Sequence, residues 1–195
     1  MLNAFAEVTS ELTELHARPE LKQATFAGGC FWCMEGPFEA MAGVVAAVVG
    51  FAGGKVENPS YEQVTQGGTG HREAVQVFYD PAQVSYRQLV ETYFWQIDPT
   101  DPYGQFADQG DHYRTAIFYH DEEQKKVAEE YITFLSNSGR YHQQIVVEVL
   151  PYKNFFPAED YHQQFYLKQQ EYYQQYKKGS GREEYIRDMQ QKYKS

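Results

Sequence analysis

The chain has 195 residues, of which 42% are hydrophobic, and a formal net charge of −10. This length and apolar content predict a globular protein with a sizeable core, and they exclude a disordered chain. The acidic balance argues against a nucleic-acid backbone or an anionic membrane surface as a partner. No apolar run approaches the roughly 20 residues of a membrane-spanning helix, and two cysteines are too few for a secreted disulfide scaffold, so we expect a cytoplasmic protein.

The first eighty residues predict alternating helices and strands. Residues 1–20 contain acids and lack the basic-then-apolar layout of a secretion signal, so a short amphipathic helix that starts after Asn3 is expected there. Pro37 cannot donate to the carbonyl of Cys33, which favours one distorted helix over two separate ones. In order, the expected elements are that first helix, a strand at 22–27, a helix at 31–41, a strand at 44–50, a helix at 61–65 capped by Ser60, and a strand at 73–80.

The rest of the chain predicts the same alternation around one long loop at 98–112. Asp-Pro pairs prevent regular structure there, and a loop of about fifteen residues inside a compact domain is usually functional. In order, the other expected elements are a helix at 86–96 capped by Ser85, a strand at 113–119, a helix at 122–136 capped by Asp121, a strand at 145–150, a polar helix at 158–177, and a last helix after the break at 179–181, ending near 192.

This order of elements predicts an α+β fold. We expect a two-layer αβ sandwich on a ferredoxin-like split βαβ core, with a helical and irregular C-terminal extension. No repeat and no linker interrupts the chain, so residues 1–195 are expected to form a single domain. Its expected parts are an N-terminal helix in 1–20, a catalytic core in 21–157, and a Gln- and Tyr-rich helical extension in 158–195.

The two cysteines lie three residues apart in the stretch Gly28-Gly29-Cys30-Phe31-Trp32-Cys33. A cysteine reacts as its thiolate, and Cys30 at the mouth of a helix would have free amides and the positive end of the helix dipole to favour an anion. Cys33, one turn further, could resolve a sulfenic acid on Cys30 as a disulfide. The alternatives are two inert buried cysteines or a zinc site. Zinc needs about four ligands, and a single C-x-x-C with no ligand spacing among the histidines predicts no metal.

Glu73 is the second residue that indicates chemistry. In a strand from Glu73 to Tyr79, alternation places Glu73 on the same face as Val75 and Val77. A carboxyl on an apolar face tends to have a raised pKa and to stay protonated, which makes Glu73 a candidate general acid. The alternative is a solvated first residue of the strand. Phe31 and Trp32 could likewise line a pocket for a small substrate group or belong to the core.

Seven motifs, in this order along the chain, resemble the A-type peptide methionine sulfoxide reductases. The resemblance runs from about Thr25 to about Gln164, which is most of the chain. The motifs are Gly29-Cys30-Phe31-Trp32, Gly50-Phe51-Ala52-Gly53-Gly54, Asn58-Pro59-Ser60-Tyr61, Gly70-His71-Arg72-Glu73-Ala74-Val75, Asp98-Pro99-Thr100, Gly110-Asp111-His112-Tyr113-Arg114-Thr115-Ala116-Ile117, and Ala158-Glu159-Asp160-Tyr161-His162-Gln163.

The resemblance implies an enzyme that reduces the S epimer of methionine sulfoxide, free or in proteins, to methionine. It implies no bound cofactor, with thioredoxin as the reductant, or dithiothreitol in the test tube. Cys30 would be the nucleophile that becomes a sulfenic acid, and Glu73 the acid that protonates the sulfoxide oxygen. The resemblance gives the other roles to Phe31 and Trp32 as walls of the methyl pocket, to Tyr61 and Tyr113 as hydrogen-bond donors to the oxygen, and to Asp108 in the same pocket.

The C-terminus departs from many members of this family, which have recycling cysteines in a glycine-rich tail. Recycling is therefore expected through a Cys30–Cys33 disulfide reduced by thioredoxin, or by direct attack of an external thiol. Tyr61 and Tyr113 could instead pack in the core, and Asp108 could be a turn residue or cap. Two other functions stay open: a general dithiol-disulfide oxidoreductase of thioredoxin type, and a non-enzymatic module that binds oxidised or methylated sulfur.

Overall fold

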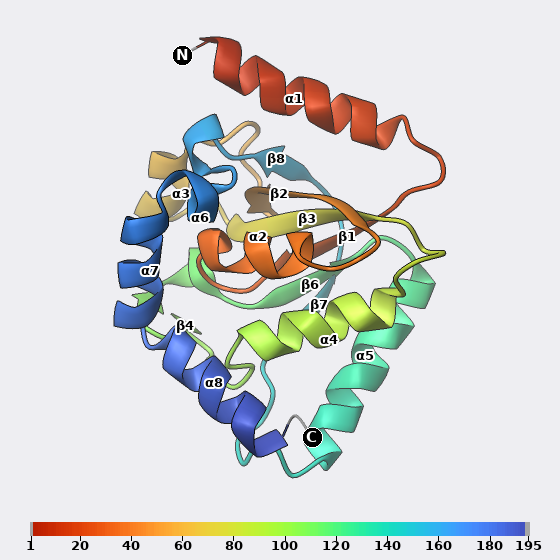
Figure 1. Cartoon of the computed structure of the whole chain (residues 1–195), viewed down its shortest axis with the longest axis vertical. Coiled ribbons are helices and arrows are strands. Elements are labelled where there is room, and N and C mark those ends of the chain that lie inside the picture. The colour runs from red at the N-terminus through yellow and green to blue at the C-terminus, as the bar shows by residue number, and fades with distance from the viewer. Residues whose placement is uncertain (1, 194–195) are drawn as a thin grey trace.

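The computed structural model describes the backbone of residues 2–193 and the side chains of residues 8–193. One curled sheet of six strands forms its centre, in the order β7-β6-β1-β3-β2-β8 (Figure 1). Neighbouring strands are antiparallel except β6 and β7, which are parallel. The strands are β1 (Lys22–Ala27), β2 (Val44–Ala52), β3 (Arg72–Tyr79), β6 (Ala116–Tyr119), β7 (Glu148–Pro151) and β8 (Phe155–Pro157).

Two interleaved split βαβ units build the middle of this sheet. In the first, β1 leads through α2 (Phe31–Glu39) to β2, and β3 lies between the two strands and antiparallel to both. In the second, β3 leads through α4 (Tyr86–Gln96) to β6, and β1 lies between them in the same way. The predicted α+β sandwich on a ferredoxin-like core is therefore confirmed, with β7 and β8 added at the two edges.

Helices cover both faces of the sheet. On one face, α2, α4 and α5 (Glu122–Asn137) enclose the main core, to which β3 contributes Val75 and Val77. On the other face, Phe78 packs against α1 (Leu2–His16) through the side chains Val8, Leu12 and Leu15. The alternation of β3 therefore separates two apolar clusters, and Glu73 shares the face of Val75 and Val77. Among the described residues, no helix is both long and apolar enough to cross a membrane.

Most predicted elements of the first half are present with small shifts at their ends. The first helix begins at Leu2, and β2 continues to Ala52. One helix contains Pro37, as expected, and it ends at Glu39. The caps Ser60, Ser85 and Asp121 each accept a hydrogen bond from the third residue of their helix, which fixes the starts of α3 (Tyr61–Gln66), α4 and α5.

The predicted helix at 158–177 is wrong. The segment forms a 3₁₀ turn (Asp160–His162), then α6 (Phe165–Lys168) and α7 (Gln170–Gly179). Gln163 interrupts it because its buried side-chain amide bonds the backbone of Val49 and the carbonyl of Ala158. The next residue, Gln164, then turns in the left-handed region at φ 52°. The last helix, α8 (Arg182–Tyr193), follows as expected.

The other differences concern short strands. β8 was not predicted, because three residues that end in Pro157 give no pattern; it pairs Phe156 with Phe51. The strand expected from Tyr113 begins only at Ala116, since Asp111–Tyr113 form a 3₁₀ turn. The strand expected at 145–150 is shorter: it begins only at Glu148, as β7. The loop at 98–112 contains a small hairpin of β4 (Gly104–Gln105) and β5 (Asp108–Gln109).

Candidate active site

The strand register brings Cys30 and Glu73 together. Phe26 in β1 lies opposite Val75 in β3, so the turn that follows β1 meets the end at which β3 begins. Cys30 is the N-cap of α2, and the free amide of Phe31 donates to Oε2 of Glu73 at 3.0 Å. Both side chains are almost fully buried, with 4% of Cys30 and 1% of Glu73 exposed. The reading of Glu73 as a solvated residue is therefore wrong.

Glu73 is neutral at pH 7 in this environment. Burial raises the pKa of its carboxyl to about 8, and the charges of Asp108 and Cys33 add to the increase. The hydrogen bond from the Phe31 amide works in the opposite direction, because it favours the carboxylate, but desolvation dominates. This buried, protonated carboxyl is bonded to the amide of Phe31, the residue after Cys30. It can therefore deliver a proton to a group that binds between the acid and the thiol.

The pKa values of the two buried cysteines shift in opposite directions. The Cys30 thiol donates a hydrogen bond to the sulfur of Cys33, and this bond lowers the pKa of Cys33 to about 7. Burial raises the pKa of Cys30 well above its ordinary value, and the charges of Cys33 and Glu73 raise it further. Desolvation therefore opposes the effect of the helix terminus at Cys30, and the directions of the two shifts favour the resting negative charge on Cys33 over Cys30.

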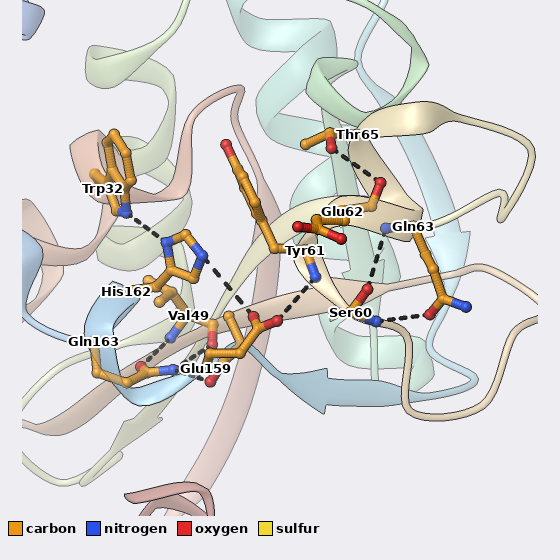
Figure 2. A network of polar contacts seen from close by, with 11 residues as sticks. Trp32, Val49, Ser60, Tyr61, Glu62, Gln63, Thr65, Glu159, His162 and Gln163 are labelled. Carbon is orange, nitrogen blue, oxygen red and sulfur yellow. Dashed lines mark hydrogen bonds and ion pairs between the residues drawn. The ribbon is translucent and has the colours of Figure 1, made fainter. Parts of the chain in front are cut away.

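Trp32 is held in place by residues of the C-terminal extension (Figure 2). Its indole Nε1 donates to Nδ1 of His162 at 3.0 Å, and its ring stacks on Phe165 with centroids 3.9 Å apart. Burial lowers the pKa of His162 to about 4, so the ring is neutral. Because Nδ1 accepts, the proton lies on Nε2, which points toward Glu159 at 3.9 Å. The contact between His162 and Trp32 spans 130 positions and could not be predicted from the sequence.

Phe31, Tyr61 and Tyr113 line the space beside Cys30. Phe31 is buried against Phe51, with Tyr61 stacked on it at 6.4 Å between ring centroids. The Tyr113 hydroxyl donates to that of Tyr61, and burial beside Glu73 raises the pKa of Tyr61 to about 12 and that of Tyr113 as well. Both phenols therefore stay protonated and can donate hydrogen bonds without adding charge.

The C-terminal extension covers both sulfur atoms. Tyr176 in α7 donates its hydroxyl to Oδ2 of Asp108 at 2.5 Å, and burial and the charge of Cys30 raise its pKa. Tyr173, one turn earlier, lies beside Cys33, and burial and the charge of Cys33 raise its pKa. All the predicted site residues thus meet around Cys30, but sequence reasoning missed Tyr173 and Tyr176. With 17 tyrosines in the chain, nothing local distinguishes these two. Among the described residues, no group of three or more His, Cys, Asp or Glu side chains could hold a metal ion.

Comparison with known proteins points to one family. The model of the family described as peptide methionine sulfoxide reductase matches residues 22–194. A peptide methionine sulfoxide reductase MsrA of Listeria monocytogenes is 50% identical over 169 residues, which are 87% of this chain and 96% of the relative. The structure of methionine sulfoxide reductase A of Corynebacterium diphtheriae is 35% identical, with a TM-score of 0.71 over 78% of this chain and 77% of that one. Mxr1 from Saccharomyces cerevisiae, crystallised in complex with Trx2, is 25% identical, with a TM-score of 0.50 over 72% of this chain and 83% of that one.

Proposed function

The chain belongs to the peptide methionine sulfoxide reductase family, and on that premise we propose that its two cysteines divide the reduction between them. The enzyme reduces methionine sulfoxide to methionine with electrons from thiols. Cys30 attacks the sulfoxide sulfur, and Cys33 resolves the product of that attack. The observation that supports this most directly is the buried carboxyl of Glu73, held by the Phe31 amide next to Cys30.

The first half of the reaction needs an acid because a sulfoxide sulfur is a poor electrophile until its oxygen is protonated. Glu73 supplies that proton, and the phenols of Tyr61 and Tyr113 donate hydrogen bonds to the same oxygen. Cys33 receives the proton of Cys30 through the hydrogen bond that the two thiols already share, so Cys30 attacks as a thiolate. The sulfoxide gains two electrons and leaves as methionine, while Cys30 keeps the oxygen as a sulfenic acid.

Selectivity for the S epimer follows from two separate sites around the sulfur. Phe31 and Trp32 form an aromatic wall for the methyl group, and Glu73, Tyr61 and Tyr113 surround the oxygen. Exchanging methyl and oxygen would put a polar atom against aromatic rings and leave the donors unpaired, which costs free energy. Asp108 lies beside this pocket through its bond to Tyr176, where it can position the rest of the substrate. Free methionine sulfoxide and oxidised methionines in proteins are both proposed substrates.

Recycling uses Cys33. Cys33 gives up the proton that it received from Cys30, and its thiolate attacks the Cys30 sulfenic acid. The disulfide forms, the hydroxide that leaves takes up a proton as water, and thioredoxin then reduces that disulfide. The complex of Mxr1 with Trx2 supports a reductant of this kind. A thiol pair that cycles in this way suits a reducing compartment, so we propose the cytoplasm as its location. We also propose that the whole chain is one domain, since α7 and α8 complete the site that α2 and β3 begin.

The test counts methionine released against protein, with methionine S-sulfoxide and dithiothreitol. Wild type turns over many times. Glu73→Gln loses most of the rate, and Glu73→Ala loses more, because an amide can still donate a hydrogen bond. A fully active Glu73→Ala variant would remove Glu73 from its role as the acid. Stoichiometric binding without methionine release would indicate a binding module, and insulin-disulfide reduction with no sulfoxide preference a general oxidoreductase.

A further inference from the structure

Arg182, the first residue of α8, is completely buried next to the cysteines, with 0% of the side chain exposed. Its guanidinium donates from Nη2 to the carbonyl of Gly28 at 2.9 Å and from Nη1 to the carbonyl of Gln96 at 2.8 Å. The guanidinium carbon lies 4.9 Å from the centroid of the Phe106 ring. Arg182 therefore ties the turn before Cys30 to the end of α4.

Arg182 and Gln105 both approach Gly29 closely. Gly29 has φ +80°, and a Cβ built there would lie 2.6 Å from Cβ of Gln105 and 2.7 Å from Nη2 of Arg182. A side chain at this position would be strained and would also collide with both residues. The turn that presents Cys30 is therefore packed against Arg182, a residue more than 150 positions away in the sequence.

Arg182 is a buried cation without a carboxylate partner. No ion pair links it to an acid in the part of the chain whose side chains are described, and its Nε has no hydrogen-bond partner. An unpaired buried charge destabilises the fold unless another group compensates it. The acceptors it does have are two carbonyl dipoles and the sulfur of Met34, 3.4 Å from Nη1. The anion that Arg182 can compensate is the thiolate of Cys33, since its charge lowers the pKa of that residue.

We propose that Arg182 is a positioning residue for the resolving step: it fixes the turn that presents Cys30 and stabilises Cys33 as a thiolate. This inference rests on the proposed function, in which Cys33 attacks the sulfenic acid on Cys30. In that step the Cys33 sulfur forms an S–S bond, the S–O bond of Cys30 breaks, and hydroxide leaves and takes up a proton as water. The thiolate, not the thiol, makes this attack, so a cation that helps Cys33 lose the proton it took from Cys30 accelerates the step.

The electrostatics of Cys33 agree with this role. After the hydrogen bond from Cys30, the charge of Arg182 is the strongest influence that lowers the pKa of Cys33. Burial and the charge of Asp108 raise the pKa of Cys33, and Lys177 also lowers it. Glu73 and Tyr173 face Cys33 as well, since its charge raises their own pKa values. The hydrogen bond from Cys30 is lost once Cys30 is a sulfenic acid, because its sulfur then bears no proton. Arg182 then remains as the main support of the Cys33 thiolate.

The test compares Arg182→Met, Arg182→Lys and a control on the same helix, Arg187→Met. Arg187 is exposed and pairs with Glu184 and Asp188, so its loss should leave both readouts unchanged. The first readout is the titration of Cys33 in a Cys30→Ser background, monitored through the ultraviolet absorbance of the thiolate. The second is a single turnover without reductant, in which methionine release and disulfide formation are timed separately.

Arg182→Met should raise the midpoint of the Cys33 titration and slow disulfide formation at neutral pH by about tenfold for each unit of that rise. The amount of methionine released, one per chain, should not change, and Arg182→Lys should keep most of the thiolate. A folded Arg182→Met variant with the wild-type midpoint and the wild-type rate of disulfide formation would overturn the proposal.

A second measurement keeps the proposal testable if Arg182→Met does not fold. The Cys30→Ser protein with Arg182 intact must titrate below the ordinary thiol value of about 8.5, and a midpoint at or above that value would overturn the proposal. Failure of the proposed function looks different. In that case wild type forms no Cys30–Cys33 disulfide after a turnover, whichever residue is at position 182.

Discussion

The burial of Glu73 makes a quantitative prediction about stability. In the folded protein its pKa is raised to about 8, whereas in the unfolded chain it returns to its ordinary value of 4.5. Between these two values the folded state binds the proton and the unfolded state does not, so stability falls as pH rises. Each pKa unit corresponds to about 1.4 kcal/mol, so the loss between pH 5 and pH 8 is roughly 4 kcal/mol.

The variant Glu73→Gln removes this titration and keeps the shape of the side chain. We predict that the unfolding free energy of Glu73→Gln, minus that of wild type, grows by roughly 4 kcal/mol from pH 5 to pH 8 and then levels off. Urea unfolding at half-unit pH steps measures both proteins. Subtracting the unfolding free energy of wild type cancels the contributions of the other titrating groups. A difference that does not change with pH would refute the reasoning, because it would mean that Glu73 is already ionised in the folded protein.

Glu35 provides a matched control. It is buried, and burial raises its pKa to about 8. Its Oε1 accepts a hydrogen bond from the amide of Gln164 at 2.8 Å, so it does not occupy the position beside Cys30 that Glu73 has. Glu35→Gln should therefore give a similar pH-dependent gain in stability. Unlike Glu73→Gln, it should leave the rate of methionine release close to wild type. The pair of variants separates a carboxyl that is merely buried from one that is buried and used.

Three further predictions concern catalysis. The single-turnover rate of methionine release should fall as pH rises through about 8, because Glu73 then loses its proton, and Glu73→Gln should lack this decline. Cys33→Ser should still release one methionine per chain, measured by amino-acid analysis, but its thioredoxin-coupled rate should fall; an unchanged coupled rate would exclude Cys33 from resolving Cys30. His162→Ala should free the indole of Trp32 and raise KM by about tenfold in steady-state assays, which corresponds to the loss of one buried hydrogen bond. An unchanged KM would contradict a role for Trp32 in the pocket.

Patterns within single elements were enough to predict the core. Alternation placed Glu73 on the apolar face of β3, and three capping residues marked the starts of helices. These features depend on spacing and on local hydrogen bonds, which a sequence displays directly. The split βαβ order followed from the sequence of elements, and it is this topology that brings β1 and β3 together at the site.

The C-terminal extension could not be predicted because its structure depends on distant partners. Gln163 leaves the helical pattern in order to bond Val49, and Arg182 lies in a segment that by composition predicts only a flexible break and a short polar helix. Arg182 is buried because its guanidinium bonds the carbonyls of Gly28 and Gln96 and lies over the ring of Phe106. The burial of Cys30, which raises the pKa of its thiol, was missed for a similar reason, since burial depends on which distant segments pack over a residue.

The most direct test is mass spectrometry of the fully reduced protein after one equivalent of methionine S-sulfoxide, with no reductant present. The mechanism predicts one methionine released per chain, a mass lower by two hydrogen atoms, and a Cys30–Cys33 link in the peptide map. Release of methionine with a gain of one oxygen on Cys30 and no link would contradict the resolving role of Cys33. Absence of any released methionine would contradict the mechanism as a whole.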